Sequence, residues 1–94
     1  MHTFTILFYS VPMTGKLEER ERVGATLKTL RELRGVKVSD MALAIGISRS
    51  YLANIEAGRK NLPPHILVRV CRFLNVPQIA IVSPGYGRKE KSAA

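Results

Sequence analysis

The chain has 94 residues, of which 46% are hydrophobic and 23% charged, and this composition is typical of one globular domain. Fifteen Lys and Arg against seven Asp and Glu give a net charge of +8, which favours an anionic partner such as nucleic acid or a membrane surface. A single cysteine, Cys71, excludes an internal disulfide and a multi-cysteine zinc site.

The first twelve residues are predicted to form a separate arm. Residues 3–11 are rich in β-branched and aromatic side chains and end at Pro12, which indicates a short strand or an extended arm over residues 1–12. A lone strand is unstable in isolation, so two interpretations remain open. The arm pairs with that of a second copy across a dimer axis, supplementing contacts through Ile79 and Val82, or it is a disordered extension.

Residues 13–83 are predicted to be largely helical, and residues 84–94 to form a disordered basic tail. The expected helices span Leu17–Arg34, Val38–Ile45, Arg49–Glu56, Pro63–Leu74 and Pro77–Val82. Gly35 and Asn75 suit left-handed caps at two helix ends. The side chains expected to face the core are Val23, Leu27, Leu30, Leu33, Val38, Met41, Ala42, Ile45, Leu52, Ile55, Leu67, Val70, Cys71 and Leu74.

The most informative segment is Val38–Glu56, where two short helices flank a turn that contains Gly46. Ser48 is a candidate N-cap for the second of these helices. This is the layout of a helix-turn-helix, whose second helix can enter the major groove of DNA. Its outward residues include Arg49 and Asn54, and these residue types can form two hydrogen bonds each with guanine and adenine, respectively.

The motif over Gly46–Asn61 reads GISRSYLANIEAGRKN, and it combines a glycine turn, a Ser-Arg-Ser run, an Ile-Glu pair and a basic loop. With this motif, Val23–Val76 resembles the Cro/cI-type helix-turn-helix family, also called the Xre family, of phage and bacterial repressors. The resemblance implies an all-α, five-helix lambda-repressor-like DNA-binding domain, here preceded by the arm. It also implies that the fifth helix contributes to dimerisation.

The resemblance places base and adjacent phosphate contacts on the second helix of the motif and backbone contacts in the loop that follows it. Arg31 and Glu56 fall where family members form an internal ion pair. The sequence departs from the family at Lys37 and Val38, where a Ser or Thr cap and a Gln are usual, and Lys37 is expected to contact a phosphate instead. Tyr51 either packs against the preceding helix or lies near the sugar-phosphate backbone. The predicted DNA-binding residues are Lys37, Ser48, Arg49, Ser50, Tyr51, Asn54, Arg59, Lys60 and Asn61.

The sequence therefore predicts a sequence-specific double-stranded DNA-binding regulator, a small cytoplasmic repressor that acts as a homodimer by occluding a promoter. No nucleophile motif, P-loop or GxGxxG is present, and His2 and His65 lie far apart, so no catalysis, cofactor or metal is expected. No membrane or small-molecule partner is expected either. The alternative is an antitoxin-like or adaptor module that keeps the fold with little operator specificity.

Overall fold

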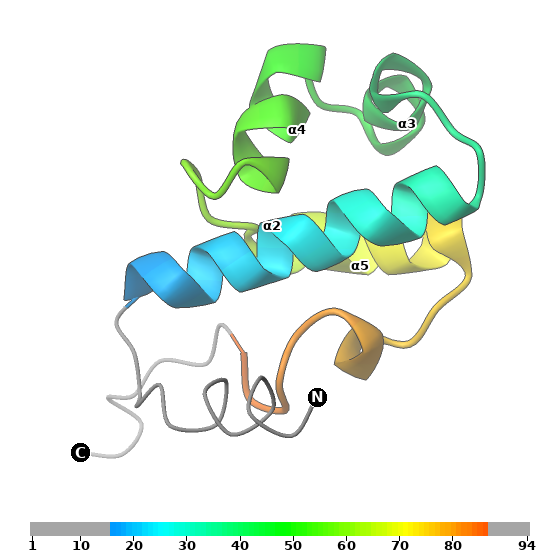
Figure 1. Cartoon of the computed structure of the whole chain (residues 1–94). Coiled ribbons are helices and arrows are strands. Elements are labelled where there is room, and N and C mark those ends of the chain that lie inside the picture. Colours follow the sequence, from blue (N-terminus) through cyan, green and yellow to red (C-terminus); the bar gives the residue numbers. More distant parts are fainter. Residues whose placement is uncertain (1–15, 87–94) are drawn as a thin grey trace, which may run out of the picture.

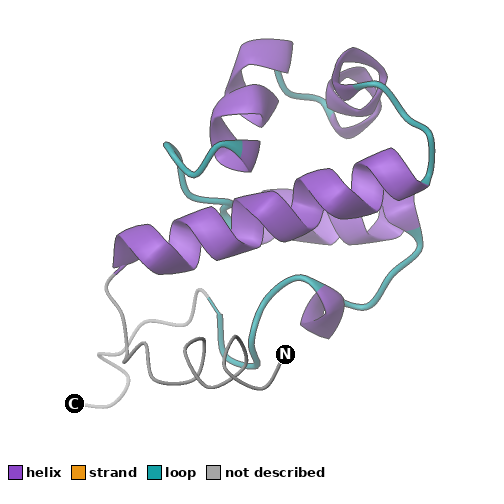
Figure 2. Ribbon diagram, viewed as in Figure 1, coloured by secondary structure: helices purple, strands orange, loops and turns teal. Residues whose placement is uncertain are grey.

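The computed structural model describes residues 16–86, which form four α-helices and one turn of 3-10 helix. The elements are α2 (Lys16–Leu33), α3 (Val38–Ile45), α4 (Arg49–Glu56), α5 (Pro64–Leu74) and the 3-10 turn η1 (Gln78–Ala80). Helix α4 packs against α2, α3 packs against both α4 and α5, and η1 packs against α5 on the side away from α3 and α4 (Figure 1). Figure 2 shows that loops alone connect the helices in this part of the chain.

The predicted arm and the predicted basic tail lie at the two ends of the chain. The arm, residues 1–12, lies outside the described residues. Most of the predicted basic tail, residues 87–94, also lies outside the described residues; before it, the chain turns at Ser83, and Tyr86 packs against the core. Among residues 16–86, no helix combines the length and apolar character that a membrane span requires.

The prediction of a fifth helix is wrong for the described residues. Only Gln78–Ala80 is helical after Pro77, as a single 3-10 turn. The turn directs Ile81 and Val82 into the core, and Pro84 disfavours a helical conformation at the residue before it. Val82 is only 4% exposed, so it is not available for the predicted dimer contact, whereas Ile79 is exposed.

The core stripe of α2 also differs from the prediction. Val23 and Leu27 are buried as expected, but Leu33 is 75% exposed. The buried face continues instead at Arg31, which follows Leu27 at a spacing of four residues. A charged side chain fills this position because Glu56 pairs with it. Leu62 and Ile66 are also buried, although the sequence analysis did not assign them to the core.

The helix ends follow local sequence rules. Gly46 ends α3 at φ 81°, and Asn75 ends α5 at φ 60°, both in the left-handed region where these residue types carry little steric penalty. The Ser48 hydroxyl accepts a hydrogen bond from the Tyr51 amide at 3.0 Å and so caps α4. The predicted limits of α3 and α4 therefore match the observed ones.

Gly24 allows α2 to approach the end of α4 more closely than any other residue would. It is buried, and a Cβ placed there would overlap the Ile55 carbonyl oxygen and lie 2.7 Å from that of Glu56. Because both neighbours are backbone atoms, neither can rotate away as a side chain would. The separation of the two helices therefore depends on the absence of a side chain at Gly24.

We expect Gly24→Ala to lower the free energy of unfolding by about 1–3 kcal/mol, because the added methyl overpacks the contact with α4. Helix propensity alone would change the free energy in the opposite direction by about 0.5–1 kcal/mol. Urea unfolding monitored by circular dichroism measures the effect. Ala25→Gly, at the exposed neighbouring position, is the control for propensity. Stabilisation by Gly24→Ala would contradict the close packing.

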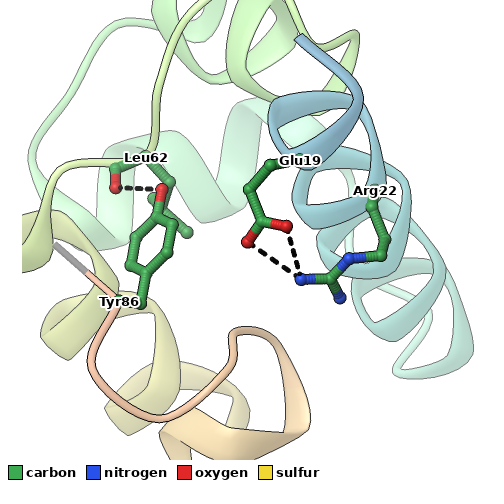
Figure 3. Close-up of polar contacts among 4 residues, drawn as sticks. All are labelled: Glu19, Arg22, Leu62 and Tyr86. Atoms are coloured by element: carbon green, nitrogen blue, oxygen red, sulfur yellow. Dashed lines mark hydrogen bonds and ion pairs between the residues drawn. The ribbon is translucent and has the colours of Figure 1, made fainter. Parts of the chain in front are cut away.

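The turn at the end of the described residues is fixed by Tyr86. Its hydroxyl donates a hydrogen bond to the Leu62 carbonyl oxygen at 2.9 Å, which ties the end of the domain to the segment before α5 (Figure 3). Burial raises the pKa of Tyr86 above its usual value near 10. The folded state therefore favours the neutral phenol, and the unfolded chain ionises first as the pH rises.

We expect Tyr86→Phe to lower the free energy of unfolding by about 0.5–1.5 kcal/mol at neutral pH, through loss of this hydrogen bond. The raised pKa contributes stability below about pH 10 that is lost at higher pH, so the difference between wild type and variant should shrink there. Denaturant melts at a series of pH values test this. Tyr51→Phe is the matched control, since its hydroxyl makes no hydrogen bond within residues 16–86. A difference that grows above pH 10 would refute the assignment.

Candidate nucleic-acid interface

Helix α4 is anchored at its carboxyl end and free at its amino end. Leu52, Ile55 and Glu56 are buried, and the last two approach the backbone of α2. The amino end, with Ser48, Arg49 and Ser50 exposed, points away from α2 (Figure 1). The polar face of α4 therefore projects outward on a fixed base, which is the arrangement that a groove-binding helix requires.

The start of α3 departs from the usual capped helix. Lys37 occupies the N-cap position with no hydrogen bond from its side chain to the helix. Its ammonium group is exposed, and Val38 packs partly against the core. Neither residue supplies a neutral side-chain donor here. A cation, Lys37, stands at the beginning of the two-helix unit.

The loop after α4 is packed onto the amino-terminal half of α2. Gly58 has φ 83°, and a Cβ there would lie 2.7 Å from Cγ of Glu21. The Arg20 Nε donates a hydrogen bond to the Gly58 carbonyl oxygen at 3.1 Å. This loop, which exposes Arg59, Lys60 and Asn61, is therefore held against the helix rather than extended into solvent.

Asn54 is half-buried and makes three hydrogen bonds with the loop. Its backbone oxygen accepts from the amides of Arg59 at 2.9 Å and Lys60 at 3.2 Å. Its side-chain Oδ1 accepts from Arg59 Nε at 2.8 Å. The predicted adenine-reading group is thus engaged with a neighbouring cation in the structure. Tyr51 packs partly against the core.

Arg31 and Glu56 form the predicted ion pair between α2 and α4. Arg31 Nε donates to Glu56 Oε2 at 2.8 Å, and Nη2 donates to Oε1 at 3.0 Å, so the pair is bidentate. Nη1 donates to the Val36 carbonyl oxygen at 2.7 Å. The side chains are only 10% and 6% exposed, and the hydrogen bond with Glu56 raises the pKa of Arg31.

Charge is strongly segregated along the described chain. Between Met41 and Tyr86 the only carboxylate is Glu56, and Arg31 neutralises it in the interior. The cations in this range are Arg49, Arg59, Lys60, Arg69 and Arg72. The surface of α4, α5 and their connecting loop is therefore basic without an exposed carboxylate, and such a surface attracts polyanions.

Two positioning residues were missed by the sequence analysis. Arg20 holds the Gly58 carbonyl, and Arg69 Nη1 donates to the Ile45 carbonyl oxygen at 3.1 Å, beside the turn between α3 and α4. Each contact joins residues far apart in the chain. No local pattern indicates them, because an arginine on an exposed helix face is ordinarily only solvated.

Comparison with known proteins identifies the architecture. Residues 22–81 match the family described as a helix-turn-helix domain. The chain belongs to this helix-turn-helix family. The turn between α3 and α4 and the anchored α4 are the helix-turn-helix unit within that match.

The helix-turn-helix chain is similar to regulators from phage and bacteria. The ImmF control region 10 kDa protein of Bacillus phage phi105 is 36% identical over 56 residues, which are 60% of this chain and 62% of that protein. The HTH-type transcriptional regulator SutR of Escherichia coli strain K12 is 36% identical over 62 residues, 66% of this chain and 35% of SutR. The chain thus spans less than two thirds of the length of either relative.

A solved structure supports the same fold. The crystal structure of the clp gene regulator ClgR from Corynebacterium glutamicum superposes with a TM-score of 0.63 at 34% sequence identity. The match covers 66% of this chain and 80% of the ClgR chain. The ClgR chain therefore shares the overall arrangement of helices over this part of the chain.

Breaking the buried ion pair of this helix-turn-helix domain should lower the free energy of unfolding far more than breaking a surface pair. We expect Arg31→Met alone, or Glu56→Gln alone, to lower the free energy of unfolding by about 3–5 kcal/mol, because the other group is left buried without its partner. Urea melts of both single variants and the double variant measure the coupling.

The control pair is Glu19–Arg22 on the surface of α2 (Figure 3), whose side chains are 39% and 42% exposed. Breaking it with Arg22→Met should cost less than about 1 kcal/mol. Equal, small losses for both pairs would show that the Arg31–Glu56 contact does not anchor α4.

Proposed function

We propose that this protein is a sequence-specific double-stranded DNA-binding transcriptional regulator that reads the major groove with α4. The observation that carries the proposal is the geometry of α4, with its inner face buried, its carboxyl end fixed on α2 and Arg49 exposed at its amino end. The adjacent surface is basic and exposes no carboxylate between Met41 and Tyr86. A rigid helix that projects outward with a cation at its exposed end matches the shape and charge of the groove.

The predicted contacts divide by chemistry. Arg49 is the principal candidate for base reading, because its guanidinium can bind guanine O6 and N7 together. Ser48 and Ser50 are short and suit an adjacent phosphate or base edge, with the partial positive charge of the helix amino end assisting. Lys37, Arg59, Lys60 and Asn61 flank the helix and suit the phosphate backbone, which positions the protein without reading sequence.

The regulatory role that fits best is a small repressor that acts as a dimer and blocks a promoter sterically. The names of the relatives support regulation: one belongs to a phage control region, and the others are a transcriptional regulator and a clp gene regulator. A dimer agrees with the two-fold symmetry of the operators that helix-turn-helix regulators bind. Ile79 is exposed on η1, opposite α4, and is available for a contact between copies.

The second candidate is a protein-interaction module that retains the fold and has lost operator reading. The start of α3 favours it, because Lys37 and Val38 replace the capping side chain and the amide expected there. Exposed Leu43 on the same helix also suits a protein partner. The basic surface around α4 favours the DNA-binding role.

Selection of bound duplexes from a random pool at near-physiological salt tests the proposal. Enrichment of a palindrome would support both sequence specificity and a symmetric dimer. Salt-dependent binding to random duplex without any enriched sequence would favour the interaction module and refute operator recognition.

Arg49 and Lys60 should fail in different ways. We expect Arg49→Ala to weaken binding to the selected duplex by about 1–3 kcal/mol and to relax the preference at one base pair in each half-site. Lys60→Ala should weaken binding to all duplexes alike and reduce the slope of log K against log salt by about one. Competition titrations with single-base operator variants separate these outcomes. Identical, sequence-independent losses would remove Arg49 from base reading.

A further inference from the structure

The carboxamide of Asn54 is committed to the loop that follows α4. Its Oδ1 accepts a hydrogen bond from Arg59 Nε at 2.8 Å. Its backbone oxygen accepts from the amides of Arg59 and Lys60 at 2.9 and 3.2 Å. Three of the hydrogen bonds that define this loop therefore end on Asn54.

The bond to Nε fixes the Arg59 guanidinium without exhausting it. A guanidinium is planar and has five N–H donors, and only Nε is used here. Within residues 16–86, the two terminal nitrogens of Arg59 make no hydrogen bond or ion pair. They form the end of the group that binds a phosphate through two parallel hydrogen bonds. Arg59 is thus held at one edge and open at the other.

The same bond constrains base reading by Asn54, because a base must either displace Arg59 or share the carboxamide oxygen with it. An asparagine that reads adenine uses its oxygen as acceptor and its nitrogen as donor at the same time. In the structure that oxygen already accepts from a charged donor, Arg59. A base that displaced Arg59 would release the loop cation, so the gain from the base would be offset by the loss at the phosphate.

The residue before Arg59 in the loop, Gly58, is also held in place by contacts with α2. Arg20 donates to the Gly58 carbonyl oxygen, and Gly58 packs directly on Glu21 of α2. The backbone on both sides of Arg59 is therefore held before any ligand binds. A side chain that is already ordered loses less conformational entropy on binding, which is the basis of pre-organised affinity.

Building on the DNA-binding function proposed above, we propose that Asn54 is a positioning residue, not a base reader. It holds Arg59 with its terminal nitrogens free for a DNA phosphate and contributes to affinity for every sequence alike. The sequence discrimination of α4 then rests on its amino end, where Arg49 lies.

A binding experiment tests the role with the full chain and fluorescent duplexes of selected and scrambled sequence at several salt concentrations. We expect Asn54→Ala to weaken both duplexes by the same factor, about tenfold or less, as for loss of one charge-assisted contact. Asn54→Ala combined with Arg59→Ala should bind no worse than Arg59→Ala alone, because the first change acts through the second residue. Lys60→Ala is the matched control, and its loss should multiply with that of Asn54→Ala. A relaxed preference at one base pair, or multiplied losses for Asn54→Ala and Arg59→Ala, would overturn the proposal.

A measurement on the free protein separates this proposal from the DNA-binding function itself. Exchange of the Arg59 Nε–H with solvent, followed by ¹⁵N NMR, should be slow in the wild type and fast in Asn54→Ala. It should stay slow in Asn54→Asp, which keeps the acceptor oxygen, although the added negative charge should weaken DNA binding. Equal exchange in wild type and Asn54→Ala would refute the contact whether or not DNA binds. A wild type that binds neither duplex would refute the proposed function, while the exchange measurement would still decide the contact.

Discussion

The carboxyl end of α4 lies directly on the backbone of α2, and the orientation of the outward helix depends on this contact. Gly24 removes the side chain that would separate the two helices. One turn further along α2, Leu27 packs in the core. Two turns further along, Arg31 donates two hydrogen bonds to Glu56. The close backbone contact at Gly24 sets the distance between α2 and α4. The planar, bidentate Arg31–Glu56 pair sets the angle between them.

The choice of an ion pair at this point is better explained by geometry than by stability. Taking both charges out of water costs several kcal/mol for each ion, and well-packed hydrophobic residues are often as stable or more so. Two apolar side chains, however, can pack in several ways, whereas a bidentate arginine–carboxylate pair has one strongly preferred arrangement. Arg31 also donates to the Val36 carbonyl oxygen, so the same guanidinium holds the linker that leads into α3. Arg31 on α2 therefore contacts α4, through Glu56, and also the linker that leads into α3.

Local sequence rules account for the parts of the fold that were predicted well. The limits of α3 and α4 follow from Gly46 and Ser48, whose conformational and capping preferences act over a few residues. Most of the errors involve contacts distant in sequence. Leu33 is exposed, and the buried face of α2 continues instead at Arg31, whose partner Glu56 lies 25 residues away. The expected fifth helix shortens because its last residues turn inward to the core, and Tyr86 is held by a hydrogen bond to the Leu62 carbonyl oxygen, 24 residues away. At the candidate site, the motif did not indicate that Asn54 is half-buried and already bonded to Arg59.

The starts of α3 and α5 share one physical feature, the lack of a neutral hydrogen-bond donor. Val38 replaces an amide at the start of α3, and Pro63 and Pro64 remove two backbone N–H groups at the start of α5. Both changes remove neutral hydrogen-bond donors from positions where helix starts can meet phosphates. Cations lie near each of the missing donors: Lys37 precedes α3, and Arg59 and Lys60 precede α5. Neutral donors confer directional contacts, whereas cations act by releasing counterions, and their contribution falls as salt rises. In the proposed complex, the replacement of neutral donors by cations makes a larger share of the affinity electrostatic. A held guanidinium at Arg59 then restores, through Asn54, part of the direction that the lost donors would have supplied.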